Sequence, residues 1–100
     1  MARNQEAIHC PAGEWTELTN ADATTITFQV QSGSVKVRAT EDDTPPALAA
    51  PGWIYHARPS DEQSEYGELA IRLDQLAAGA SRLFAMPTSG RRAIVLVDHA

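Results

Sequence analysis

The sequence has little cysteine, no long apolar run and few basic residues, and each shortage excludes a class of protein. Cys10 is the only cysteine, so no internal disulfide can form and the fold does not depend on an oxidising compartment. No apolar run approaches the ~20 residues of a membrane span, and the first residues lack the apolar stretch of a signal peptide. We therefore expect synthesis in a cytoplasm and no membrane partner.

The charge balance is acidic. Eight basic and thirteen acidic side chains give a formal net charge of −5. Proteins that bind nucleic acid need a basic surface, because phosphate backbones repel negative charge. We therefore expect no nucleic-acid partner.

What the chain does have is strict alternation of apolar and polar residues on both sides of Gly33. Ile26, Phe28 and Val30 alternate with polar residues in the candidate strand 24–31, and Val35 and Val37 do so in the candidate strand 35–40. A period of two indicates strands with one buried face, and a short glycine-containing link between two such strands predicts an antiparallel hairpin.

Five further segments are candidate strands: 15–18, 52–56, 67–73, 82–86 and 93–97. The segment 67–73 is ambiguous, because its leucines also fit a helical stripe that continues to Leu76. We predict a strand there, followed by a short helical turn near 74–79. The last segment is apolar at every position, so we expect it to lie centrally in a sheet or under a partner subunit.

Seven short strands separated by turn signals predict an all-β protein, an antiparallel β-sandwich of the jelly-roll or Greek-key kind. Residues 14–100 are expected to form this single domain, and residues 1–13 an extended N-terminal lead-in. The segments 41–51, with its adjacent prolines, and 59–65 are expected as surface loops.

Residues that could carry catalysis or bind a metal do not form a recognised pattern. His9 and Cys10 are adjacent, whereas His56 and His99 are isolated, and no pair has the spacing of a zinc site. The acidic run 41–43 does not have the ligand spacing of a calcium-binding loop, so we expect a solvated loop there. We expect no catalytic, cofactor-binding or metal-binding residues, and no enzyme activity.

Five residues are candidates for contact with a partner or ligand: Trp15, Trp53, Tyr55, Arg91 and Arg92. The aromatic residues, together with Tyr66, fit either a platform on which sugars stack or anchors in a core or interface, and we favour anchors. The arginine pair fits either a partner contact or a solvated pair at a strand edge.

Several segments together resemble a group of small β-sandwich proteins of tailed phages and prophages. The resemblance covers about residues 15–100 and is carried by Thr25–Arg38, the proline-containing loop, Gly52-Trp53, Arg82–Gly90, the valine-rich strand and Asp98-His99-Ala100. Such proteins are head-decoration, spike-base or small tail components of virions, and the resemblance implies no catalytic residues.

Two functions are expected, the first from the resemblance and the second from the Trp and Tyr residues and the fold. The first is a structural or assembly module of a phage-like particle, which contacts other virion proteins or forms a homo-oligomer. For a phage-derived chain this implies synthesis in a bacterial cytoplasm and a final location in the virion. The alternative is a glycan-binding β-sandwich that uses surface Trp and Tyr residues.

Overall fold

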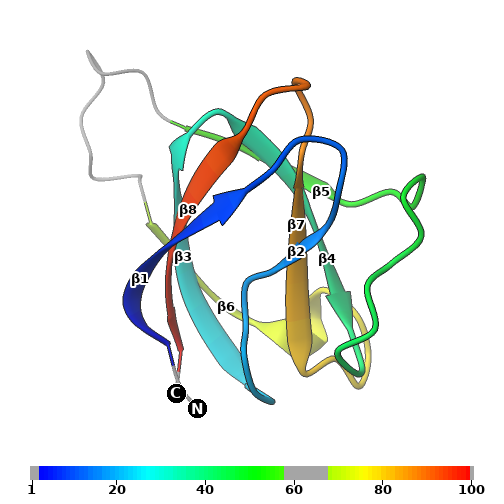
Figure 1. Cartoon of the computed structure of the whole chain (residues 1–100). Helices are drawn as coiled ribbons and strands as arrows, with labels where there is room; N and C mark the ends of the chain where they lie inside the picture. Colours follow the sequence, from blue (N-terminus) through cyan, green and yellow to red (C-terminus); the bar gives the residue numbers. More distant parts are fainter. Residues whose placement is uncertain (1–2, 58–67, 100) are drawn as a thin grey trace.

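Two four-stranded antiparallel sheets pack face to face in the computed structural model, which describes residues 3–57 and 68–99 (Figure 1). The first sheet has the order β1-β8-β3-β6, with β1 at Arg3–Cys10, β8 at Ala93–His99, β3 at Thr25–Ser32 and β6 at Glu68–Arg72. The second has the order β2-β7-β4-β5, with β2 at Thr16–Glu17, β7 at Arg82–Pro87, β4 at Ser34–Thr40 and β5 at Trp53–His56. The predicted all-β sandwich is confirmed.

The core lies between the two sheets and is built from every second residue of the central strands. Its fully or almost fully buried members include Ile26, Phe28, Val30, Val35, Val37, Leu83, Ala85, Val95 and Val97. The polar residues between them face outward, as the alternation predicts. Within β8 every second residue is buried and the others are half-buried, and β8 lies between β1 and β3, so its predicted central position is confirmed.

The predicted hairpin is wrong in its pairing, although both of its strands exist. β3 pairs with β8 and β6, whereas β4 pairs with β7 and β5, so the link at Gly33 carries the chain from one sheet to the other. Gly33 has φ +79°, a conformation that favours glycine and permits this abrupt turn. Alternation shows only that a strand has one buried face. It is equally expected for two strands that face each other across a core and for two strands that are hydrogen-bonded neighbours in one sheet.

The segment 1–13 was expected as an extended lead-in, and residues 3–10 are indeed extended. They form β1, however, which pairs antiparallel with β8 from Arg3↔His99 to Cys10↔Ala93. Within the described residues the sandwich therefore has eight strands instead of about seven. Cys10 is fully buried in the core, so its thiol is neither partly exposed nor part of a loose segment.

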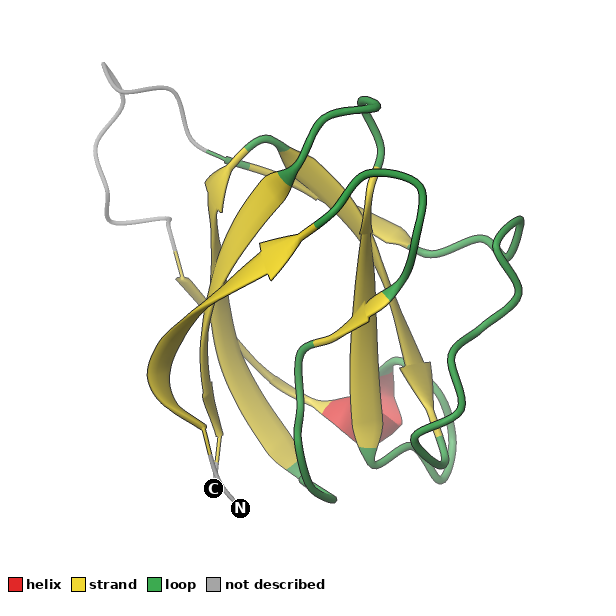
Figure 2. Cartoon of the chain, viewed as in Figure 1, coloured by secondary structure: helices red, strands yellow, loops and turns green. Residues whose placement is uncertain are grey.

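The chain after β4 follows the sequence prediction closely. Residues 41–51 form a surface loop, β6 is a strand rather than the start of a helix, and a single 3-10 turn follows it at Leu73–Gln75 (Figure 2). Leu73 is fully buried, so this turn closes one end of the core. The predicted loop 59–65, Tyr66 and Gly67 lie outside the described residues.

Candidate functional site

Trp15 lies on the outer face of the second sheet, where a stretch of the 41–51 loop crosses it. Its indole Nε1 donates a hydrogen bond to the carbonyl of Ala47 at 2.9 Å, and the Lys36 ammonium sits 5.2 Å from the ring centroid. Lys36 and Arg38 of β4 in turn donate to the carbonyls of Ala50 and Pro51, each at 2.9 Å. We call residues 47–51 the strap, because these bonds tie it to β4.

The burial of Trp15 makes it an anchor of the fold. The side chain is only 7% exposed, yet it lies outside the main core cluster, as does the buried Phe84 of β7. Phe84 is opposite Arg38 in the β4–β7 register, which places it on the same outer face. The anchor interpretation of Trp15 is therefore supported, and its ring is not available for stacking.

Trp53 differs from Trp15, because 59% of it is exposed. It is the first residue of β5, at the edge of the second sheet. Beside it is a hollow of about 290 Å³ lined by Arg38, Pro51, Gly52 and Trp53. A neighbouring hollow of about 120 Å³ extends from Trp53 toward Leu76 and Ala77. An aromatic ring and a guanidinium thus share one surface depression.

Gly52 explains how β5 approaches β4 so closely at this point. A Cβ on Gly52 would lie 2.6 Å from the carbonyl oxygen of Val37, a distance that real Cβ atoms essentially never show. Any other residue would push the start of β5, and with it Trp53, away from the sheet. The Gly52-Trp53 pair therefore positions the hollow.

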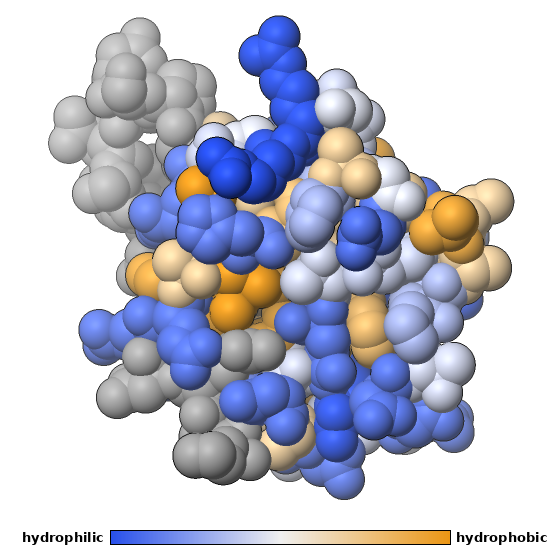
Figure 3. All heavy atoms as spheres, in the orientation of Figure 1, coloured by the Kyte–Doolittle hydropathy of each residue, from blue (hydrophilic) through white to orange (hydrophobic). Residues whose placement is uncertain are grey.

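Exposed apolar side chains concentrate around this edge. Ile54 is 59% exposed and Leu48 of the strap is 61% exposed, and with Trp53 they are the large hydrophobic residues that the described chain leaves in solvent. In Figure 3 hydrophobic atoms are visible at the right-hand margin, over the loop that follows β4, and a second group of them lies left of centre. We refer to Trp53 and Ile54 as the β5 edge.

Tyr55 faces the opposite way from Ile54, into the sandwich. Its ring packs edge-on against Phe28, with the centroids 5.2 Å apart. Burial raises the pKa of the Tyr55 hydroxyl. Among the described aromatic candidates, Trp53 alone presents its ring to solvent, and Tyr66 lies outside the described residues. The structure therefore does not bring Trp15, Trp53 and Tyr55 together as a stacking platform.

Arg91 and Arg92 are exposed in the turn between β7 and β8. This turn lies at the end of the sandwich near Gly33, where an added Cβ would come within 3.6 Å of the Arg92 carbonyl. Trp53 is opposite Val37, which lies several residues beyond Gly33 along β4. The arginine pair and the β5 edge therefore form separate surfaces.

A polar network that the sequence analysis did not identify joins β2, β7 and the turn before β3. Arg82 donates from Nη1 to Glu17 at 2.8 Å and from Nε to Asp22 at 3.0 Å. These bonds raise the pKa of Arg82, and the bonds from Arg82 and Ser81 lower the pKa of the Asp22 carboxyl. Thr19 donates to Glu17 and accepts from the backbone of Leu83, so the network stabilises the β2–β7 pair.

The candidate metal ligands are dispersed. Burial raises the pKa of the Cys10 thiol to about 11, which leaves it neutral and unreactive near pH 7. His9 is exposed, whereas His99 is buried and accepts a hydrogen bond from the Asn20 backbone at 3.4 Å. No group of three or more His, Cys, Asp or Glu side chains suited to a metal occurs in the part of the chain that the structure describes.

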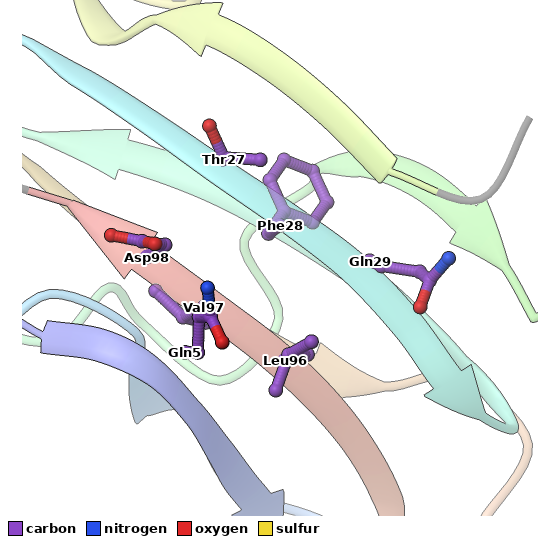
Figure 4. Close-up of a pocket in the computed structure, with 7 residues that line it drawn as sticks. All are labelled: Gln5, Thr27, Phe28, Gln29, Leu96, Val97 and Asp98. Atoms are coloured by element: carbon purple, nitrogen blue, oxygen red, sulfur yellow. The ribbon is translucent and has the colours of Figure 1, made fainter.

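The outer face of the first sheet carries a third depression, a groove of about 260 Å³ between β1, β8 and β3 (Figure 4). A bulge between Arg3 and Glu6 interrupts the register of β1 with β8, and Gln5 has φ +53°. The groove is lined by Gln5, Thr27, Phe28, Gln29, Leu96, Val97 and Asp98, none of which is cationic. Its amide, hydroxyl and carboxylate groups suit a neutral polar ligand better than an anion.

Comparisons with known proteins found no match among family models, curated proteins or solved structures. In the described residues no helix is long and apolar enough to span a membrane. The β5 edge with its hollow is the surface feature with the clearest binding chemistry.

Proposed function

We propose that this chain is a structural module of a phage-like particle and acts through protein–protein contacts made by the β5 edge. The observation that carries the proposal is the pair of exposed side chains, Trp53 and Ile54, each 59% exposed on an edge strand. Tryptophan is enriched among the residues that dominate interface energies, because a large ring buried in a partner pocket removes much apolar area from water.

The hollow beside Trp53 suits such a contact. Arg38 lies at its rim and already donates to the Pro51 carbonyl, so its guanidinium is held in place before any partner arrives. An aromatic anchor beside a positioned arginine matches the composition of interface centres. The resemblance of residues 15–100 to small tailed-phage proteins supports virion proteins as the partner class.

The test is whether purified particles from the strain that carries the gene contain this chain. We expect a constant ratio of chain to major particle protein through successive purification steps, and a lower ratio for Trp53→Ala. Gln31→Ala, which changes an exposed residue of β3, is the matched control and should leave the ratio unchanged. A chain that is absent from purified particles would refute the proposal.

Glycan binding is a second candidate, and the hollow of about 290 Å³ beside Trp53 supports it. A tryptophan ring can stack on a sugar face, and the Arg38 guanidinium can bind a carboxylate of an acidic sugar. On a glycan array we expect any signal to disappear in both Trp53→Ala and Arg38→Ala. A signal that persists in both variants, or the absence of any signal, would exclude this site for glycans.

A further inference from the structure

The two sheets end in four edge strands: β1 and β6 in one sheet, β2 and β5 in the other. An edge strand exposes unpaired N–H and C=O groups, and proteins usually protect it with charge, proline, bulges or shortness. β2 has two residues, β1 contains a bulge and the charged Glu6, and β6 contains the charged Arg72. β5, with the sequence Trp-Ile-Tyr-His, has no Asp, Glu, Lys, Arg or Pro and pairs with β4 in regular register.

The register of β5 on β4 shows which of its backbone groups point away from the sheet. The Ala57 N–H donates to the Gly33 carbonyl at 2.9 Å, so this pair is hydrogen-bonded across the two strands. Hydrogen-bonded and non-bonded pairs alternate in an antiparallel ladder. Trp53 and Tyr55 therefore also bond to β4, and the N–H and C=O of Ile54 and His56 point outward.

We propose that β5 pairs antiparallel with β5 of a second copy of this chain, about a two-fold axis at Ile54, and joins two four-stranded sheets into one continuous sheet. The inference deepens the proposed function and rests on it, since it names the partner of the β5 edge.

The faces of the side chains leave two registers, and the side-chain pairs select one of them. Residues that oppose each other across an antiparallel pair must lie on the same face of the sheet, so Ile54 can face only Ile54 or His56 of the second copy. With Ile54 opposite itself, its outward N–H and C=O meet their symmetry mates in a hydrogen-bonded pair. Trp53 then opposes Tyr55 of the other copy, and both positions become apolar or aromatic pairs, which stabilise antiparallel sheets.

Charge does not oppose this pairing, although the chain carries a net charge of −5. β4 and β5 contain no acidic residue, and the acidic run after β4 lies in the 41–51 loop. Lys36 faces the same side as Ile54 but is held by the Ala50 carbonyl of the strap. A strand with uncharged side chains is self-complementary in this arrangement, which favours a second copy over an unrelated peptide.

The dimer should be weak in dilute solution. A standard interface buries ~800 Å² per partner, about a seventh of the 5838 Å² surface of this chain. A pair of four-residue strands buries less, so we expect dimers at high protein concentration, and on a particle that holds copies close together at millimolar effective concentration.

Cysteine cross-linking tests the register directly. In a hydrogen-bonded pair the Cα atoms lie about 5.5 Å apart, which a disulfide can span, so Ile54→Cys should give a disulfide-linked dimer under mild oxidation. In Trp53→Cys each cysteine opposes Tyr55 of the other copy, so the two cysteines lie two residues apart along the paired strands. Their Cα atoms are then beyond the ~7 Å limit for a disulfide, and this variant should remain uncross-linked. The native Cys10 is fully buried and should not interfere.

Sedimentation of the unmodified chain up to ~1 mM provides the second measurement. We expect the mass to rise toward twice the monomer value, and Ile54→Lys to weaken dimerisation at least tenfold by placing two ammonium groups face to face. Gln31→Lys adds the same charge on β3 and should cause less than a threefold change. A monomer at ~1 mM, or equal cross-linking of Ile54→Cys and Trp53→Cys, would overturn the self-pairing.

The two proposals fail in different ways. If the chain stays monomeric but Trp53→Ala is lost from particles, the self-pairing is wrong and the assembly function stands. If the dimer forms as described but particles do not contain the chain, the assembly function is wrong and the self-pairing stands.

Discussion

Phe28 offers the sharpest test of how the two sheets hold together. It is 1% exposed, belongs to the central strand β3, and its ring meets Tyr55 of the opposite sheet at a centroid distance of 5.2 Å. Phe28→Ala removes the ring from a close-packed core and leaves a cavity, so we expect unfolding to become easier by about 3–5 kcal/mol. Against an ordinary stability of ~5–15 kcal/mol, this loss brings the chain near the limit of folding.

The assay is urea unfolding followed by the fluorescence of the buried Trp15. With a urea dependence of ~1–3 kcal/mol per molar, Phe28→Ala should lower the midpoint by roughly 2 M. Phe28→Asp should cost at least as much, because it buries an unpaired carboxylate. The neighbouring Gln29 is half-buried on the outer face, so Gln29→Asp should cost less than about 1 kcal/mol. Equal midpoints for Phe28→Asp and Gln29→Asp would refute the assignment of the two faces.

Three further predictions concern single positions. Gly52→Ala should destabilise the chain by about 1–3 kcal/mol, seen as a lower melting temperature, because its Cβ would lie 2.6 Å from the Val37 carbonyl oxygen; an unchanged melting temperature would contradict the close approach of β5. Gly33→Ala should cost about 1–2 kcal/mol in the same measurement, since φ is +79° there, and Gly33→Asn, which tolerates this conformation better, should cost less. Cys10 should not react with a water-soluble thiol reagent at pH 8 until urea unfolds the chain. Because burial raises its pKa from 9.0 to about 11, stability should fall as the pH rises through that window, where only the unfolded thiol ionises; rapid labelling of the native protein would contradict its burial.

The strands were predictable wherever alternation was strong, but their partners were not. β3 and β4 appear within one or two residues of their expected bounds, with the expected faces buried. The error lay in pairing them, because a period of two reports only which side of a strand is apolar. β1 was missed as a strand, since its sequence is mostly polar and only Ile8 and Cys10 are apolar at alternate positions; its outer residues are exposed because it is an edge strand.

The candidate site was predictable in its residue types and not in its geometry. Trp15 and Trp53 each stand at the start of an apolar stretch, and nothing local distinguishes them. The strap covers Trp15 through the Ala47 carbonyl, whereas Trp53 lies on an edge strand with 59% of its surface exposed. The burial of Trp15 and the exposure of Trp53 both depend on where residues 41–51 cross the second sheet. That position is set by tertiary structure and not by local sequence.

The connection of β3 and β4 to different sheets has a consequence for the order of folding. Among the strand pairs that the described residues form, only β4–β5 joins neighbours along the chain, and β1 has β8 as its single partner. No local hairpin at Gly33 can serve as an early nucleus. Long loops must therefore close before the strands at their ends can form hydrogen bonds. This requirement places folding in the slow millisecond-to-second range of all-β domains. During synthesis on a ribosome the first sheet cannot be completed until residues 93–99 emerge. Before that point β1 has no strand partner and β3 can pair only with β6. The incomplete sheet then exposes the apolar faces that are buried in the folded sandwich.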